Sequence, residues 1–261
     1  MRLLLPLAAV LTGVLATPSH AAVKSRVVDY EAGGVPLQGY LAWDDAAKGK
    51  RPGVLVVHEW WGHNQHARNA ADKLAKEGYV AFALDMYGKG KVTTHPDSAQ
   101  AFAAEAMKEP QVMKARFLAA LDVLKQDPHV DPSRIAAFGY CFGGAVALAM
   151  ARQGTDLAAV VTFHGALATQ QPAAAGAVKA RLLVLSGQDD AMITPEQIEA
   201  FKKEMTAAGA KFEVVSLPHA RHSFTNPDAD KAGMPALAYN AEADKESWTR
   251  AMKLLGEVFG S

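Results

Sequence analysis

The stretch Gly139-Tyr140-Cys141-Phe142-Gly143-Gly144 joins a short apolar run, residues 134–138, to a helical one, residues 145–151. A strand that turns abruptly into a helix and carries Gly-x-Cys-x-Gly at the bend has the pattern of a nucleophile elbow. At such a bend the central residue is strained so that its side chain stands above the sheet edge, and the glycines remove Cβ atoms that would clash. The amide groups that begin the helix favour a thiolate over a thiol. The stretch therefore predicts that Cys141 is a catalytic nucleophile.

A structural interpretation of the same cysteine stands beside the catalytic one. A free cysteine next to glycine in an apolar segment is commonly a small buried hydrophobe. The catalytic interpretation requires that an acid and a base follow along the chain, in loops that fold to the same place.

The rest of the chain predicts one α/β domain over residues 23–261. Apolar or β-branched runs indicative of strands lie at residues 26–31, 37–43, 54–57, 79–84, 134–138, 157–163, 181–185 and 212–217. Helical patterns lie at 65–77, 98–107, 111–125, 145–152 and 195–208, and residues 236–259 are predicted to be mostly helical. Buried strands that alternate with helices indicate a mostly parallel sheet covered on both faces. The first two strands, which meet at Gly33-Gly34, are predicted to form a hairpin at its edge.

Functional groups in such a sheet gather in the loops at the carboxyl ends of the strands. One such loop, Ser186 to Ile193, contains Asp189 and Asp190, and another, Pro218 to Asn226, contains His219 and His222. The order Cys141, Asp190, His222 is nucleophile, acid, base. His222 would take the thiol proton and later protonate the leaving group, and Asp190 would orient the imidazole. Asp189 and His219 remain alternatives, although the position of Asp190 three places after Gly187 and the Ser-Phe pair after His222 favour the first choice.

These motifs together resemble those of the dienelactone hydrolase family, and the likeness covers nearly all of the chain after residue 22. It rests on residues 57–62 (Val-His-Glu-Trp-Trp-Gly), 85–87 (Asp-Met-Tyr), 139–144, 187–190 and 222–224. The resemblance implies the α/β-hydrolase fold, a Cys-His-Asp triad, no cofactor, and hydrolysis of esters or lactones through a thioester. It also implies that Glu59 contacts the thiol, and that the backbone amides of Trp60 and Phe142 form an oxyanion hole.

The sequence departs from this family where the substrate's carboxylate would be bound. Dienelactone hydrolase uses arginines after Asp-x-Tyr and after His-Ser-Phe, and the corresponding residues here are Lys89 and Asn226. Lysine keeps a point charge without the bidentate fork, and asparagine keeps neither. This argues against dienelactone itself as the substrate. Three further residues at strand ends, Trp61, Tyr87 and His164, are candidates for lining the cleft, and a packing role is an equal alternative for them.

The histidines near residue 60 do not predict a metal site. The run His58 to His63 resembles the His-Glu-x-x-His motif of zinc proteases, but its second histidine falls one place too late to share a helix face with the first. His63 and His66 are expected to face solvent or the rim of the pocket.

Residues Met1 to Ala22 predict a secretory signal peptide outside the fold. Arg2 precedes a short apolar run, and Ser19 and Ala21 are small residues at the −3 and −1 positions of a cleavage site. The apolar run is too short for a membrane anchor and is interrupted by Pro6 and Gly13. We expect an exported protein, periplasmic in a host with two membranes or otherwise secreted, with no stable membrane anchoring.

Composition and cysteine content limit the binding partners that the protein can have. Half of the residues are hydrophobic and the formal net charge is +0, so nothing indicates binding to nucleic acid or to an anionic membrane surface. The single cysteine cannot form an internal disulfide, and its presence in an exported chain requires an explanation such as catalysis or deep burial. The expected partner is a small ester or lactone, and a monomer is permitted while the oligomeric state stays open. The alternative function is a non-catalytic exported binding protein of the same fold.

Overall fold

The structure, a computed structural model, describes residues 23–260, so the predicted signal peptide lies outside the described residues. The strands are β1 (Val23–Ala32), β2 (Val35–Asp44), β3 (Arg51–Val57), β4 (Val80–Leu84), β5 (Val130–Tyr140), β6 (Ala159–Phe163), β7 (Arg181–Gly187) and β8 (Phe212–Leu217). The helices are α1 (Gln65–Lys76), α2 (Pro96–Lys108), α3 (Pro110–Gln126), α4 (Phe142–Arg152), α5 (Pro195–Ala207) and α6 (Ala241–Phe259), with a 3-10 turn at Ala229–Ala232.

All eight strands belong to one sheet with the order β1-β2-β4-β3-β5-β6-β7-β8. β1 and β2 form the predicted hairpin, β2 pairs with β4 in antiparallel fashion, and the remaining neighbours are parallel. The mostly parallel sheet that the alternation of strands and helices predicts is confirmed.

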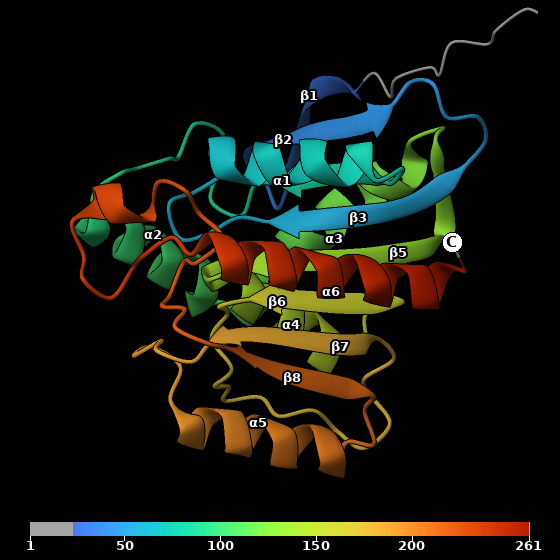
Figure 1. The fold of residues 1–261 in the computed structure, drawn as a ribbon. Coiled ribbons are helices and arrows are strands. Elements are labelled where there is room, and N and C mark those ends of the chain that lie inside the picture. The colour runs from blue at the N-terminus through green and yellow to red at the C-terminus, as the bar shows by residue number, and fades with distance from the viewer. Residues whose placement is uncertain (1–22, 261) are drawn as a thin grey trace, which may run out of the picture.

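Helices cover both faces of the sheet, because its central strands are apolar on both sides. Leu55 and Val57 of β3 pack into one hydrophobic cluster with α3, α4 and α5, whereas Val54 and Val56 pack into a second cluster with α1 and α6. Figure 1 shows α1 and α6 lying in front of the strands. This two-sided packing holds the carboxyl ends of the parallel strands rigidly along one edge of the sheet.

The last helix begins later than its sequence pattern predicts. Residues 236–240 are not helical: the Ala238 N–H donates to the carbonyl of His222 at 3.1 Å, and the Asn240 N–H donates to the carbonyl of Phe224 at 3.1 Å. The Asn240 side chain then caps α6 by accepting from the amides of Glu242 and Ala243. The helix begins only at Ala241 because the preceding segment is held against the loop that carries His222.

Each helix of the described chain is too short or too polar to cross a lipid bilayer.

Candidate active site

Cys141 lies at the bend between β5 and α4 in a strained backbone conformation. Its φ and ψ angles are 52° and −115°, values that non-glycine residues rarely adopt. Hydrogen bonds hold the bend from both sides: the Cys141 N–H donates to the carbonyl of Phe163 at 3.0 Å, and the Gly144 N–H donates to the carbonyl of Cys141 at 3.0 Å. The thiol is partly exposed at the amino end of α4. The local geometry is therefore that of the elbow predicted from the sequence.

The neighbouring glycines are required by close backbone approach. A Cβ atom at Gly139 would overlap the carbonyl of Gly143, and one at Gly143 would overlap the carbonyls of Val57 and His58. Since these neighbours are backbone atoms of β3 and α4, they cannot move aside independently. The absence of side chains at these positions lets α4 lie directly against the end of β3, next to the loop that carries Glu59.

His222 and Asp190 meet although their loops follow different strands. His222 Nδ1 and Asp190 Oδ2 are 2.8 Å apart, and both side chains are almost fully buried. The second carboxylate oxygen of Asp190 accepts from the Met192 amide at 2.8 Å, which fixes the orientation of the carboxylate. Because the carboxylate of Asp190 accepts from Nδ1–H, it fixes the tautomer of the imidazole and leaves Nε2 available for proton transfer.

The Nε2 atom of His222 is buried and has no hydrogen-bond partner of regular geometry, and the group that interacts with it is the Cys141 thiol. Burial alone would lower the pKa of His222. The interaction with Cys141, together with the hydrogen bond and charge of Asp190, outweighs burial and raises the pKa of His222 to about 10. At neutral pH this imidazole therefore carries a proton.

The alternative acid and base point elsewhere. The side chains of Asp189 and His219 are exposed, and neither makes a hydrogen bond to Cys141 or His222 within the described residues. The backbone of Asp189 donates to the carbonyl of Ala220 at 2.9 Å and thereby ties the acid loop to the base loop. Of the four possible acid–base pairs, the structure brings together Asp190 and His222.

The backbone amides of Trp60 and Phe142, which the resemblance assigns to the oxyanion hole, are without an acceptor within the described part of the chain. The loop of Trp60 is held from below: the Tyr87 hydroxyl donates to the Trp60 carbonyl at 3.1 Å. His58 Nε2 accepts from the Met86 amide at 3.2 Å, so the other ring nitrogen carries the proton. Two free N–H groups, one at the start of a helix and one in a fixed loop, can donate hydrogen bonds to a negatively charged oxygen.

The carboxylate of Glu59 is buried and bridges to the base loop. Its Oε1 accepts from the Ser223 hydroxyl at 2.8 Å, and its Oε2 accepts from the Asn226 amide at 2.6 Å. Within the described residues no hydrogen bond joins Glu59 to Cys141, and the predicted contact with the thiol stays a prediction. Asn226, expected to face the substrate, has its amide nitrogen committed to Glu59. Sequence reasoning missed the role of Ser223, whose only signal is its place in the polar run after His222.

We expect that replacing Asn226 with alanine destabilises the protein by about 2 kcal/mol, because one oxygen of a buried carboxylate loses its donor. Urea denaturation measures the change. Asn69→Ala is the matched control, since the Asn69 side chain is exposed and bonds only to Gln65 at the surface. Equal stabilities of the two variants would contradict the assignment of Asn226 as a support for Glu59.

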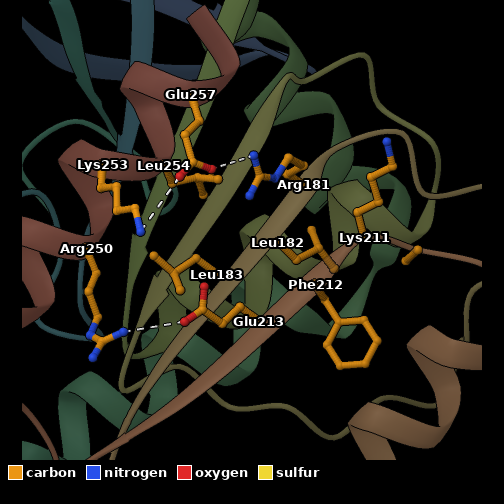
Figure 2. Close-up of a pocket in the computed structure, with 11 residues that line it drawn as sticks. Arg181, Leu182, Leu183, Lys211, Phe212, Glu213, Arg250, Lys253, Leu254 and Glu257 are labelled. Atoms are coloured by element: carbon orange, nitrogen blue, oxygen red, sulfur yellow. Dashed lines mark hydrogen bonds and ion pairs between the residues drawn. The ribbon is translucent and has the colours of Figure 1, made fainter.

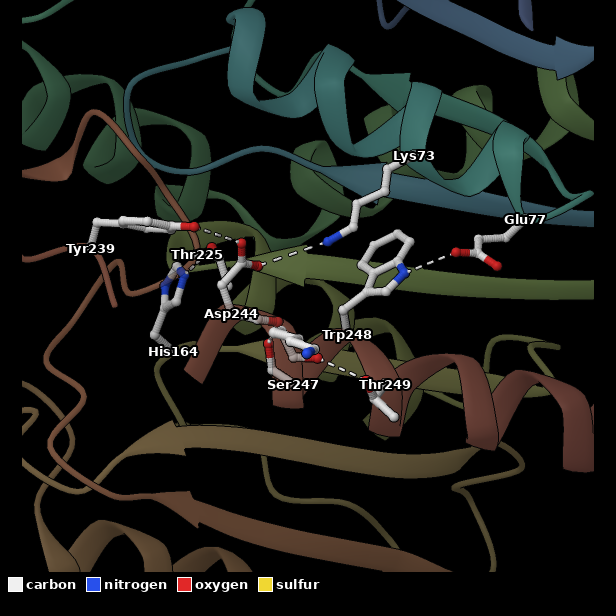
Figure 3. Close-up of polar contacts among 10 residues, drawn as sticks. Lys73, Glu77, His164, Thr225, Tyr239, Asp244, Ser247, Trp248 and Thr249 are labelled. Atoms are coloured by element: carbon white, nitrogen blue, oxygen red, sulfur yellow. Dashed lines mark hydrogen bonds and ion pairs between the residues drawn. The ribbon is translucent and has the colours of Figure 1, made fainter. Parts of the chain in front are cut away.

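For His164 and Tyr87, which the sequence left equally open to lining the cleft or packing, the structure shows packing: both side chains are buried. His164 has no exposed surface: its Nε2 pairs with the Thr225 hydroxyl at 2.9 Å (Figure 3), and its ring lies 5.1 Å from that of His222. Tyr87 packs edge-on against His58, with ring centroids 4.7 Å apart. Their positions at strand ends predicted proximity to the site correctly, but tight packing leaves no surface of either for a substrate. Burial also lowers the pKa of His164 well below its usual range, so this ring is neutral beside charged His222.

The two remaining substrate candidates lie farther out. Lys89 forms an exposed ion pair with Asp29 at 2.7 Å, so its charge is partly compensated at the surface. Trp61 is mostly buried and packs with Ala99, Ala229 and Leu237. A role in substrate binding stays a prediction for both.

A large cavity elsewhere carries little of this chemistry. Its volume is about 710 Å³, and it lies at the amino ends of β7 and β8 beside α6, opposite the edge that carries Cys141. Arg181 and Lys253 pair with Glu257 across it, and Arg250 pairs with Glu213 (Figure 2). Mutually paired charges of this kind stabilise a surface and offer no nucleophile.

The described residues contain no group of three or more histidine, cysteine, aspartate or glutamate side chains placed to hold a metal ion. His58, the first histidine of the zinc-like run, has both ring nitrogens engaged with backbone groups of Glu59 and Met86.

The chain is similar to known proteins over most of its length. The sequence model described as "Dienelactone hydrolase family" matches residues 37–259. The chain is 30% identical over 222 residues to "Protein usf" of Aquifex pyrophilus, covering 83% of this chain and 94% of that one. It is 28% identical over 221 residues to a protein of Aquifex aeolicus that is named, provisionally, a carboxymethylenebutenolidase, with the same coverage of both chains.

A solved structure agrees with the sequence comparisons. The crystal structure of P91, a dienelactone hydrolase-like promiscuous phosphotriesterase from metagenomic libraries, superposes with a TM-score of 0.86 at 39% identity. The match covers 91% of this chain and 99% of P91. The fold of the described residues is accordingly the α/β-hydrolase fold that the resemblance implies.

Proposed function

This chain belongs to the dienelactone hydrolase family, and from that premise we propose that it hydrolyses small carboxylic esters or lactones by attack of Cys141, through a thioester. The observation that carries the proposal is the buried row of groups behind the thiol: Asp190 holds His222 at 2.8 Å, and the interaction with Cys141 contributes to the raised pKa of His222. A cysteine that served only as packing would need neither partner.

The first half of the reaction forms the thioester. The Cys141 thiolate attacks the carbonyl carbon, and the developing oxyanion accepts hydrogen bonds from the amides of Trp60 and Phe142. As the carbon–oxygen bond breaks, the Nε2 proton of His222 passes to the departing alkoxide. Asp190 keeps the ring oriented and compensates its positive charge. In a lactone the alcohol remains attached to the acyl group, so ring opening yields a hydroxyacyl thioester.

The second half releases the acid. His222, now neutral, takes a proton from water, and the resulting hydroxide attacks the thioester carbonyl within the same pair of amides. Collapse of the tetrahedral intermediate breaks the carbon–sulfur bond and regenerates the thiolate beside the imidazolium. Glu59, held by Ser223 and Asn226, fixes the loop of Trp60 to the base loop.

Trapping the thioester tests this proposal. The protein is mixed with p-nitrophenyl acetate, quenched in acid within the first turnover, and examined by intact-mass and peptide mass spectrometry. We expect one acetyl group on the peptide that contains Cys141, which is unambiguous because the chain has a single cysteine. Prior treatment with iodoacetamide should abolish both the adduct and the turnover. Turnover that survives alkylation would refute the cysteine mechanism, and a lack of turnover across a broad ester and lactone panel would favour the binding-protein alternative.

The pH dependence follows from the raised pKa of His222. Below a pKa of about 10 the imidazolium is present and can protonate a leaving alcohol, and above it this proton is lost. For an ester of an aliphatic alcohol, kcat/KM should therefore fall on the alkaline side near pH 10. Asp190→Asn removes one of the causes that raise the pKa, so its alkaline limb should move to lower pH. An unmoved limb would show that Asp190 does not interact with the group that titrates.

We also infer from residues 1–22 that the chain is exported. Fractionation of the native host and amino-terminal sequencing of the mature protein test this inference, with Ala22 or Val23 expected as the first residue. Full-length protein in the cytosolic fraction would contradict it.

A further inference from the structure

A groove of about 300 Å³ runs along α4, and its lining begins at Ala145, one helical turn after Cys141. Its floor is formed by Ala145 and Ala149, one wall by the α2–α3 junction with Met107 and Met113, and the other wall by residues 168–171 after β6.

The position of the floor residues connects the groove to the elbow. Ala145 and Ala149 are four residues apart, so they share one side of α4, and Cys141, which precedes the helix as its N-cap residue, lies one turn before Ala145. The Ala145 N–H points back to the carbonyl of Cys141 at 3.4 Å. Cys141 also packs against the same hydrophobic cluster as Met113 and Ala149. A group attached to the sulfur can therefore extend over Ala145 toward Ala149 without leaving this side of the helix.

The lining of the groove is suited to an uncharged alkyl group of a substrate. The methyl groups of the two alanines leave space that larger side chains would fill, and Met107 is 45% exposed at the wall. Methionine adapts to irregular apolar partners. The single charged group of the lining, Arg152, is already engaged: it pairs with Glu204 at 2.8 Å and donates to the carbonyl of Leu167 at 2.8 Å. It therefore offers no free cation to a substrate carboxylate.

The geometry points to an acyl-chain subsite: the groove along α4 binds the alkyl part of the acyl group that is carried on Cys141, which makes aliphatic esters of medium chain length the preferred substrate class. This inference rests on the proposed function and deepens it. A substrate that carries a free carboxylate, as dienelactone does, would find no unpaired cation in this groove.

Chain-length dependence tests the subsite. The kcat/KM values of the mature protein are measured for the p-nitrophenyl esters of acetate, butyrate, hexanoate and octanoate. We expect a rise of up to about fourfold for each methylene that the groove covers, equivalent to about 0.8 kcal/mol. Ala149→Phe fills the far half of the groove and should abolish the gain for hexanoate and octanoate while acetate turnover is kept. Ala207→Phe, on the exposed side of α5, is the matched control and should retain the full gain.

A second variant tests the same groove independently, in case Ala149→Phe fails to fold. Met107→Trp narrows the groove from its exposed wall and should reduce the gain for the longer esters in the same way. A flat wild-type series, or a gain that persists in both groove variants, would overturn the subsite while leaving ester hydrolysis itself intact. Failure to turn over even the acetyl ester would instead overturn the proposed function, and the subsite with it.

Discussion

Replacement of Cys141 by alanine is expected to lower kcat/KM for p-nitrophenyl acetate by at least about 10⁴-fold, or about 5 kcal/mol of transition-state stabilisation. The reason is that the acyl group then has no atom to which it can be transferred. His222 and Asp190 retain their mutual hydrogen bond. Without the thiol, however, the imidazole can only act as a general base that assists direct attack of water on the ester. Steady-state kinetics of the two proteins measure the change.

The matched control is Cys141→Ser, which keeps the size and position of the nucleophile but loses its acidity. Because serine needs the base to remove its proton in the transition state, we expect activity between those of wild type and Cys141→Ala. Circular dichroism and urea denaturation verify that both variants are folded. If Cys141→Ala kept more than about a tenth of the activity, acyl transfer to this sulfur would be excluded.

Replacement of Gly143 by alanine is expected to cost about 3 kcal/mol of unfolding free energy or more, a large fraction of the stability of an ordinary domain. The added Cβ would occupy the space of the carbonyls of Val57 and His58, at the end of β3. Relief requires α4 to move away from the sheet, which would also displace Cys141 and the Phe142 amide. Urea denaturation and ester turnover should therefore both report a loss.

Gly78→Ala provides the contrast for this glycine. Gly78 has a φ of +91° and open space around its Cα, so an alanine there meets only the backbone cost of about 1 kcal/mol. Activity should be unchanged, because Gly78 lies between α1 and β4, at the amino end of that strand. A Gly143 variant no less stable than the Gly78 variant would show that α4 is not held against β3 as tightly as the structure indicates.

The secondary structure was predictable wherever packing reinforces local pattern. The strand at residues 212–217 agrees with its prediction at both ends, and the elbow and α4 were readable from glycine spacing. Residues 236–259 are mostly helical, as predicted, but the segment 236–240 is not helical although its alanines favour a helix. There the bonds from Ala238 and Asn240 to the base loop outweigh that propensity, and such bonds cannot be seen along the chain.

For the site, the order of Cys141, Asp190 and His222 along the chain predicted which residues would be candidates, because each one follows a strand that ends at the same edge of the sheet. The choice between Asp189 and Asp190 could not be made reliably that way. Adjacent residues in a loop point in different directions, and only the turn that engages the Met192 amide aims Asp190 at His222.

Sequence by itself determined the class of fold, the elbow and the family, because periodicity, glycine spacing and short motifs are local properties of the chain. Tertiary structure alone decided the roles of His164, Tyr87, Asn226 and Ser223. Whether a polar side chain at a strand end meets a substrate or another side chain depends on what the other loops place beside it. Burial and pairing are sums over neighbours that are distant in sequence, and so they appear only when the sheet and its two helical layers are assembled.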